Sequence, residues 1–167
     1  GATASRNYVP GLTEAFYSNL PIVAVTSTQL TGRVGHLMEQ VIDRSNPMKD
    51  IAKKSIQIGT IHTEEDGWAV GVAINDALLE MRRGGGGPVH INLTTTYSPD
   101  YSVKELPSVK GIRRYLQQDD FPSLEGKKVL IQIGAHSRWG DELRELVDQF
   151  CEQYNATVSC EHISNYR

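Results

Sequence analysis

Short apolar runs alternate with longer amphipathic stretches in the first part of the chain. Residues 21–27 read PIVAVTS, a nearly continuous apolar run that predicts a strand covered on both faces in a parallel sheet. The stretches KSIQI at residues 54–58 and PVHINLT at residues 88–94 predict two further strands. We therefore expect an α/β fold built on parallel strands.

Apolar residues at helical spacing predict a helix before the first of these strands. Asn7 is placed to cap a helix that begins at about Pro10, since proline suits the first helical turn. The buried face of this helix would consist of Leu12, Ala15, Phe16 and Leu20. Shorter helical stretches are expected at residues 36–41 and 47–52.

A capping pattern predicts another helix between the second and third strands. Thr63 is followed three residues later by Asp66, which is the spacing of a capping box. The buried stripe of this helix would be Val70, Ile74, Ala77, Leu78 and Met81. The glycines at residues 84–87 would end the helix and lead into the third strand. They do not match a phosphate-binding P-loop, because a P-loop follows a strand and carries GK[ST], whereas this run follows a predicted helix.

Residues 98–125 divide the chain into two parts. Pro99, Pro107 and Pro122 interrupt mixed polar sequence without sustained periodicity, which is typical of an interdomain connection. Beyond it, the strand pattern KKVLIQIG, a long amphipathic stretch and the strand pattern ATVSC predict one βαβ unit. The sequence thus predicts three-layer αβα elements in residues 1–97 and 126–167, joined by a linker.

The composition excludes several classes of partner. The net charge is -3, the sequence pI is near 6.0 and no Lys/Arg cluster is longer than a pair, so nothing indicates binding to nucleic acid or to an anionic membrane. No apolar run approaches the roughly 20 residues that span a bilayer. Cys151 and Cys160 lack metal-binding spacing, which predicts reduced core thiols in a cytoplasmic protein.

Few residues form a recognisable catalytic pattern. No two of the five histidines lie at metal-ligand spacing, and no GxSxG motif accompanies them. His36 is the one histidine at a candidate ligand site. It lies in an irregular segment after a strand, where an open α/β sheet binds its ligands. The small residues 1–5 before the first helix either let a ligand approach the backbone or form a tight turn that only packs.

A second candidate site lies in the last part of the chain. IGAHSRWG at residues 133–140 follows a strand and precedes a helix, where backbone N–H groups can meet a phosphate. The segment lacks the GxGxxG pattern of dinucleotide-binding folds. A non-catalytic nucleotide-binding module of the ADP or FAD type therefore stays an alternative, as does a fragment that binds no ligand.

Several ordered motifs resemble the thiamine-diphosphate-dependent acetolactate synthase family and its decarboxylase relatives. The matching stretches are GATASRNYVPGLTEAFYSNLPIVAVTSTQ, GHLMEQVID, KDIAKKS and GGGGPVHINL. Within them the family's positions are matched in order by Gly1-Ala2-Thr3, Gly11-Leu12 with Ala15, Pro21, Gly35 with Gln40, and Gly86-Gly87-Pro88-Val89. The longer opening loop, with Asn7, Tyr8 and Pro10, is more similar to the succinyl-enolpyruvyl-cyclohexene-carboxylate synthases of menaquinone biosynthesis.

This resemblance implies the fold and cofactor of a larger enzyme. Residues 1–97 would be the C-terminal part of a pyrimidine-binding domain, and residues 126–167 would begin a Rossmann-like central domain. The cofactors would be thiamine diphosphate and Mg²⁺, and the chemistry decarboxylation of a 2-oxo acid followed by carboligation, in the transferase or lyase class. The activating glutamate would lie upstream and the diphosphate and metal site downstream, so that the chain is an internal, inactive piece without catalytic residues or metal ligands of its own.

The resemblance also implies roles for particular residues. The residues that would border the cofactor are Gly1, Thr3, Asn7 and Gln40. The residues that would meet a substrate carboxylate are Arg33, His36 and Lys53. Glu39 stands where acetolactate synthases have an aromatic residue before the glutamine, which weakens the match to a pyruvate-sized pocket. Because the family builds active sites between subunits, we also expect a homo-oligomer.

Overall fold

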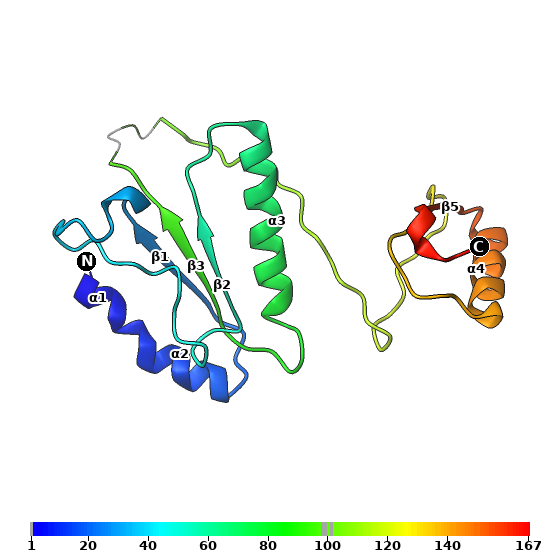
Figure 1. Cartoon of the computed structure of the whole chain (residues 1–167), viewed down its shortest axis with the longest axis horizontal. Helices are drawn as coiled ribbons and strands as arrows, with labels where there is room; N and C mark the ends of the chain where they lie inside the picture. Colours follow the sequence, from blue (N-terminus) through cyan, green and yellow to red (C-terminus); the bar gives the residue numbers. More distant parts are fainter. Residues whose placement is uncertain (1, 98–99, 101) are drawn as a thin grey trace. The chain divides into compact units, whose positions relative to one another are not determined.

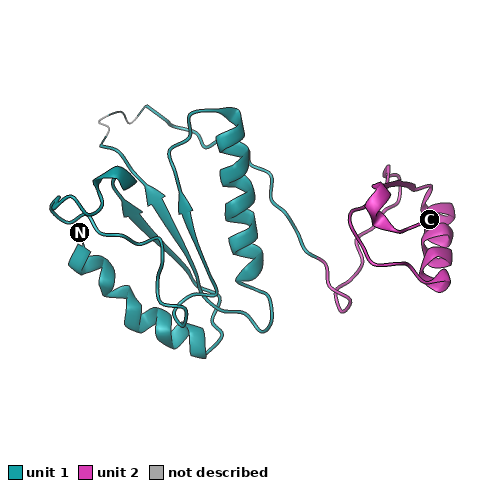
Figure 2. Cartoon of the chain, viewed as in Figure 1, with its two compact units in different colours: residues 1–114 teal, residues 115–167 magenta. Residues whose placement is uncertain are grey.

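The chain folds into two compact units in the computed structural model, which describes residues 2–97, 100 and 102–167. Unit 1 is Gly1–Arg114 and unit 2 is Tyr115–Arg167 (Figure 2). The division between them falls inside the stretch 98–125 that the sequence marks as a linker.

Unit 1 is a parallel three-stranded sheet with helices on both faces. Its elements are α1 (Ala2–Arg6), α2 (Tyr8–Tyr17), β1 (Val23–Thr28), the 3₁₀ turn η1 (Thr31–Arg33), β2 (Lys54–Ile58), α3 (Glu64–Glu80) and β3 (Val89–Thr94). The strand order is β1-β3-β2, and all pairings are parallel (Figure 1). Helix α3 packs on β2 and β3, whereas Tyr8 of α2 lies against His90 on the opposite face of β3. The predicted αβα arrangement of an α/β fold is confirmed.

The third strand, not the first, is covered on both faces. Residues Val89, His90, Ile91 and Asn92 of β3 are all buried, because β3 lies between the other two strands and between the helical layers. The prediction that residues 21–27 are covered on both faces is wrong. In the edge strand β1 the side chains of Val23 and Val25 are 38% and 59% exposed, since α3 packs mainly on β2 and β3.

Helix α3 begins at the predicted capping box. The Thr63 hydroxyl accepts a hydrogen bond from the Asp66 backbone N–H, and the Asp66 carboxylate accepts one from the Thr63 N–H. The predicted stripe is only partly buried: Ala77 is fully buried, but Leu78 is 39% exposed. Residues 84–87 form the predicted helix-to-strand connection. A Cβ on Gly86, at φ +91°, would lie 2.9 Å from the Asn19 carbonyl oxygen, which requires glycine there.

The opening of the chain differs from its prediction as a turn. Residues 2–6 form α1, because alanine favours helix and the Ser5 hydroxyl bonds back to the Ala2 carbonyl. Asn7 precedes α2 in a helical conformation, φ -67° and ψ -14°, without a side-chain capping bond. Pro10 falls in the first turn of α2, where its missing N–H costs no helical hydrogen bond. Gly1 lies outside the described residues.

The short helices predicted at residues 36–41 and 47–52 are absent, since the structure has only turns at these described positions. Gly35, Leu37 and Gln40 all have positive φ angles, of 83°, 54° and 60°, which interrupt any right-handed helix. The segment between β1 and β2 is therefore irregular, as the sequence motif around His36 suggested.

Unit 2 contains the predicted βαβ unit. Its elements are β4 (Leu130–Ile133), α4 (Asp141–Tyr154), β5 (Thr157–Cys160) and the 3₁₀ turn η2 (His162–Ser164), with β4 and β5 parallel. Both cysteines are free, but Cys151 is half-buried and Cys160 is exposed, so the prediction that both are core residues is wrong. Within the described residues, no helix combines the length and apolar character that crossing a membrane requires.

Candidate functional site

A buried polar layer covers the face of the unit 1 sheet that lies toward α1 and α2. Strand alternation places Thr26, Ser55 and His90 on this face. His90 Nε2 lies 2.8 Å from Thr26 Oγ1, and its Nδ1 lies 2.8 Å from Ser55 Oγ. Burial, with a smaller contribution from nearby Arg44, lowers the pKa of His90, so the imidazole is neutral at pH 7.

Asn92 extends this layer toward the carboxyl ends of the strands. Its Oδ1 accepts hydrogen bonds from Thr26 Oγ1 at 2.6 Å and from Thr28 Oγ1 at 3.2 Å. Its Nδ2 donates to Gln57 Oε1 at 2.6 Å and lies 3.0 Å from Thr28 Oγ1. The amide thus joins all three strands through side chains, and its hydrogen-bonding capacity is used within the protein.

A buried arginine lies where this layer reaches the carboxyl edge of the sheet. Arg44 is 6% exposed and donates from Nη1 to Thr28 Oγ1 at 2.9 Å. Its Nε and Nη2 both donate to Ser5 Oγ on α1, at 3.2 and 2.8 Å. Burial lowers the pKa of Arg44, Tyr8 opposes this lowering and Arg6 adds to it, but an arginine stays charged at neutral pH. A cation is therefore held between α1 and the end of β1.

The residues predicted to border a cofactor gather on the same side of unit 1. The Gln40 side-chain carbonyl accepts a hydrogen bond from the Ala2 backbone N–H, so residue 40 lies beside the start of α1. Thr3 and Asn7 are exposed, and within the described residues their side chains make no hydrogen bond. Gly1, the fourth predicted residue, is outside the described part. Thr3 and Asn7 thus offer donors and acceptors to a ligand beside α1.

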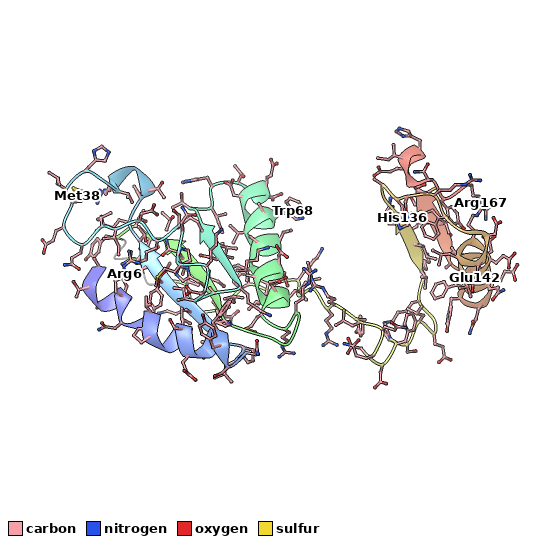
Figure 3. The ribbon with its side chains drawn as sticks, turned by 60° about the horizontal axis from the view of Figure 1, so that its bottom comes forward. Arg6, Met38, Trp68, His136, Glu142 and Arg167 are labelled. Carbon is pink, nitrogen blue, oxygen red and sulfur yellow. The ribbon has the colours of Figure 1, made fainter. Side chains whose placement is uncertain are left out.

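Two of the three predicted substrate residues lie on the segment that joins β1 to Gln40. Arg33 Nη1 donates to Gln29 Oε1 at 2.7 Å, and His36 is exposed. Arg6 on α1 and Met38 on this segment lie on the same side of unit 1 (Figure 3). These side chains leave cationic and polar groups accessible beyond the carboxyl end of β1, the usual ligand side of an open α/β sheet.

Lys53 lies at the amino ends of the strands, on the opposite side of the sheet from its carboxyl edge. It immediately precedes β2, and its backbone N–H donates to the Pro88 carbonyl at 2.8 Å, just before β3 begins. Its ammonium donates to the carbonyls of Arg83 and Gly84, at 2.6 and 3.1 Å. The structure therefore separates Lys53 from His36 and Gln40 and gives it contacts that hold the glycine-rich turn.

Sequence reasoning did not identify Arg44 or the polar layer as a site. A charged residue in an irregular segment is normally exposed, so nothing in the pattern singled out Arg44. The polar layer did carry a signal, because Thr26, Thr28, His90 and Asn92 occupy alternate positions of two strands. His90 itself makes buried contacts through both ring nitrogens, which indicates a structural role.

The loop of the alternative phosphate site in unit 2 is tied to the last turn of the chain. The His136 backbone N–H donates to the Ile163 carbonyl at 3.3 Å, and Asn165 Nδ2 donates to the His136 carbonyl at 2.6 Å. Trp139 Nε1 also donates to a carbonyl of the last turn. The first turn of α4 carries Asp141 and Glu142, whose charges disfavour an anion there. These contacts argue against a nucleotide phosphate at residues 133–140.

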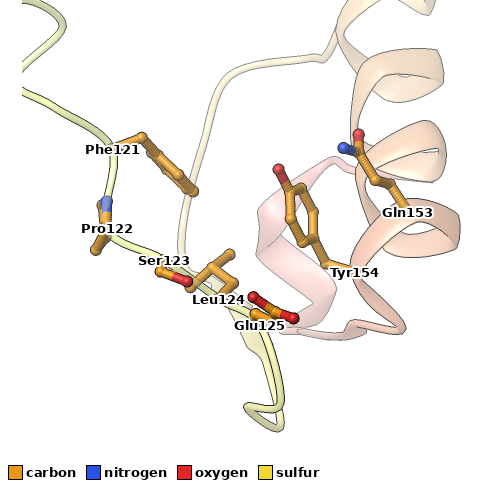
Figure 4. A pocket seen from close by; sticks show the side chains of 7 residues that line it. All are labelled: Phe121, Pro122, Ser123, Leu124, Glu125, Gln153 and Tyr154. Carbon is orange, nitrogen blue, oxygen red and sulfur yellow. The ribbon is translucent and has the colours of Figure 1, made fainter.

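Unit 2 has a shallow hollow of about 430 Å³ beside the end of α4 (Figure 4). It is lined by Phe121, Pro122, Ser123, Leu124, Glu125, Gln153 and Tyr154. Phe121 is 66% exposed, and the hollow brings together a single carboxylate and no cation. Among the described residues of the whole chain, no three His, Cys, Asp or Glu side chains gather as metal ligands. The carboxyl edge of unit 1 is thus the stronger candidate.

Comparison with known proteins gives one consistent group of relatives. No family model matches the chain. The 2-succinyl-5-enolpyruvyl-6-hydroxy-3-cyclohexene-1-carboxylate synthase of Bacteroides thetaiotaomicron is 35% identical over 114 residues, which is 68% of this chain and 20% of that protein. The protein of the same name from Porphyromonas gingivalis is 26% identical over 181 residues, covering 99% of this chain and 30% of that protein. The chain therefore spans between about a fifth and a third of its relatives' length.

Proposed function

The chain is homologous to a part of the thiamine-diphosphate-dependent 2-succinyl-5-enolpyruvyl-6-hydroxy-3-cyclohexene-1-carboxylate synthases, and from this premise we propose that it contributes one wall of a 2-oxo-acid site in a larger enzyme. The whole enzyme would decarboxylate a 2-oxo acid and join the remaining fragment to a second substrate, as a transferase or lyase. This chain alone would be inactive.

The observation that carries the proposal is the position of Gln40. Gln40, which the sequence resemblance matches to the family's glutamine, lies beside the start of α1 and beyond the carboxyl end of β1. Parallel α/β sheets bind ligands at that edge. The exposed hydroxyl of Thr3 and the exposed amide of Asn7 are available to a polar heterocycle at the same place.

These side chains suit a pyrimidine ring, which needs both donors and acceptors at its edge. Thr3 would present a hydroxyl, while Asn7 and Gln40 would present amides that can donate or accept. The cofactor supplies the electron sink for decarboxylation when it is bound. The task of this chain is to bind and orient the ring, since the resemblance puts the activating glutamate and the Mg²⁺ site outside residues 1–167.

Arg33 and His36 would recognise the acid group of the substrate. Both side chains are exposed on the segment after β1. The Arg33 guanidinium is held by Gln29 through one N–H, so other donors of its fork stay available for a carboxylate. Lys53 was proposed for the same role, but its ammonium is engaged at the opposite edge, so we assign the acid group to the two residues near Gln40.

The family resemblance also supports a proposal for the assembly and location of the whole enzyme. We propose a homo-oligomer whose sites lie between subunits, acting in the cytoplasm. A nucleotide-binding module is the less favoured function, because the loop at residues 133–140 is tied to residues 163–165.

The test compares Gln40→Ala with His90→Ala in the full-length protein that contains this chain. Gln40→Ala should reduce turnover with an unchanged melting temperature, because the side chain serves the ligand. His90→Ala should lower the melting temperature first, because its ring bonds to Thr26 and Ser55 in the buried layer. Loss of turnover in His90→Ala at full stability, with Gln40→Ala near wild type, would contradict the placement of the site.

A further inference from the structure

The hydrogen bonds of Arg44 leave part of its guanidinium unused. A guanidinium has five N–H donors in a planar fork. In Arg44, Nε and Nη2 each direct one N–H to Ser5 Oγ, and Nη1 directs one to Thr28 Oγ1. All these acceptors are neutral hydroxyl oxygens. Among the described residues, the buried guanidinium therefore has no carboxylate paired with it.

Nearby acids do not compensate that charge. In the described parts of the chain, outside positions 1, 98–99 and 101, no carboxylate forms an ion pair with Arg44. The neighbouring Asp43 directs its Oδ1 to the backbone N–H and the hydroxyl of Ser45, at 2.8 and 2.6 Å. Arg6 adds a second positive charge and lowers the pKa of Arg44 further. The local field therefore favours an anion.

The Nε–Nη2 edge of Arg44 has the geometry that pairs with two oxygens of one anion. These two N–H groups point in parallel and match the two oxygens of a carboxylate. In the structure they converge instead on the single oxygen Ser5 Oγ, with the longer contact at 3.2 Å. A carboxylate would give each donor its own acceptor and would neutralise the buried charge.

We propose that the Nε–Nη2 edge of Arg44 binds a carboxylate of a small-molecule ligand, and that the Ser5 hydroxyl holds this position when the ligand is absent. Ser5, whose hydroxyl the carboxylate would replace, belongs to the five-residue helix α1. That helix is attached at its other end through the Ala2–Gln40 hydrogen bond. Ligand binding at Arg44 would thus shift the same segment that borders Thr3 and Gln40. This proposal rests on the proposed function only for the identity of the acid that binds at Arg44.

The test titrates this chain with succinate, without cofactor, and follows the Arg44 Nε–H resonance by NMR. Succinate should shift that resonance in the wild type. In Arg44→Gln the affinity should fall at least about tenfold, the effect of losing a charge-assisted pair. Arg82→Gln is the matched control, since Arg82 is an exposed arginine beyond the end of α3 and should leave succinate affinity unchanged. Affinity in the variants is measured by calorimetry, beside thermal melting curves.

Two further variants keep the test decisive if Arg44→Gln does not fold. Arg44→Lys retains the charge but loses the fork, so it should also bind succinate more weakly. Ser5→Ala removes the competing hydroxyl and should bind succinate more tightly than wild type. Weaker binding by Ser5→Ala, equal binding by folded Arg44→Lys, or no effect of succinate on the wild type would overturn the proposal.

Inorganic phosphate serves as the second probe. Binding of phosphate but not succinate would also overturn the proposal, since it would assign the position to a phosphate group. Because the succinate titration involves no cofactor and no turnover, absence of succinate binding would leave the Gln40→Ala assay informative. Conversely, unchanged turnover in Gln40→Ala would not alter the result of the succinate titration.

Discussion

The two faces of the unit 1 sheet hold the same three strands by different means. Toward α3, Val89 and Ile91 are buried among apolar side chains, whereas toward α1 and α2 the buried residues are His90 and Asn92. Apolar burial contributes free energy in proportion to area, about 25 cal/mol per Å². A buried polar group contributes only while its partners are correctly placed. The apolar face should therefore tolerate changes of shape, and the polar face should not tolerate loss of hydrogen bonds.

The largest expected effect is that of Asn92→Leu. The substitution keeps the side-chain size but removes one hydrogen-bond partner each from Thr26, Thr28 and Gln57. Leaving buried groups unpaired costs about 1–3 kcal/mol each, so we expect a loss of about 3 kcal/mol or more in the free energy of unfolding. Urea denaturation measures it. A stability equal to wild type would refute the claim that this face depends on hydrogen bonding.

The second largest effect is expected from acid, which should lower the stability that the polar face contributes. The folded-state pKa of His90 is lowered, first by burial and then by Arg44. Below about pH 6.5 the unfolded chain binds a proton that the folded chain does not. Stability should consequently decrease as the pH falls from about 6.5 to the folded-state pKa, and this contribution should level off below that value. The free energy of unfolding, measured by denaturation between pH 7.5 and about 5, should change less with pH in His90→Gln than in wild type. An equal pH dependence in the two proteins would exclude His90 as the cause.

A conservative change on the apolar face should cost less. Ile91→Val removes one methylene from the next residue of the same strand, where the side chain is 7% exposed. The expected loss is about 1 kcal/mol, measured by the same urea denaturation. If this variant lost more stability than Asn92→Leu, the ranking of the two faces would be reversed.

The smallest effect is expected where the apolar face is uncovered. Val25 points to the same side as Ile91 but lies on the edge strand β1, with 59% of its surface exposed. Val25→Thr should change the free energy of unfolding by less than about 0.5 kcal/mol. A larger loss would show that something in solution covers this part of β1, and light scattering of the two proteins would then reveal whether a second copy does so.

The strands and α3 could be predicted because their signals are local. The apolar run at residues 21–27, the alternation in residues 88–94 and the Thr63–Asp66 spacing each act within a few residues. Coverage of the faces could not be predicted in the same way, because it depends on where α3 packs. The exposed valines of β1 show this limit.

The candidate site could be proposed from the sequence only in part, for a related reason. Gln40 and His36 were identified from a family motif and a strand end, which are features of the sequence itself. Arg44 became visible only when the chain brought Ser5 and Thr28 around it, at separations of 39 and 16 residues. Lys53 resembled a substrate residue by position, yet it lies at the start of β2, at the other edge of the sheet from the end of β1.

The strand order β1-β3-β2 also dictates when the sheet of unit 1 can form during synthesis. Within the described residues, β1 and β2 pair with β3 and not with each other, and Thr26 meets Asn92 across 66 residues of chain. The central strand is the last of the three to leave the ribosome. Until it does, two strands with unpaired edges must wait, and such edges are prone to aggregation. A chain that stopped before residue 88 would lose not one strand of the sheet but the pairing of all three.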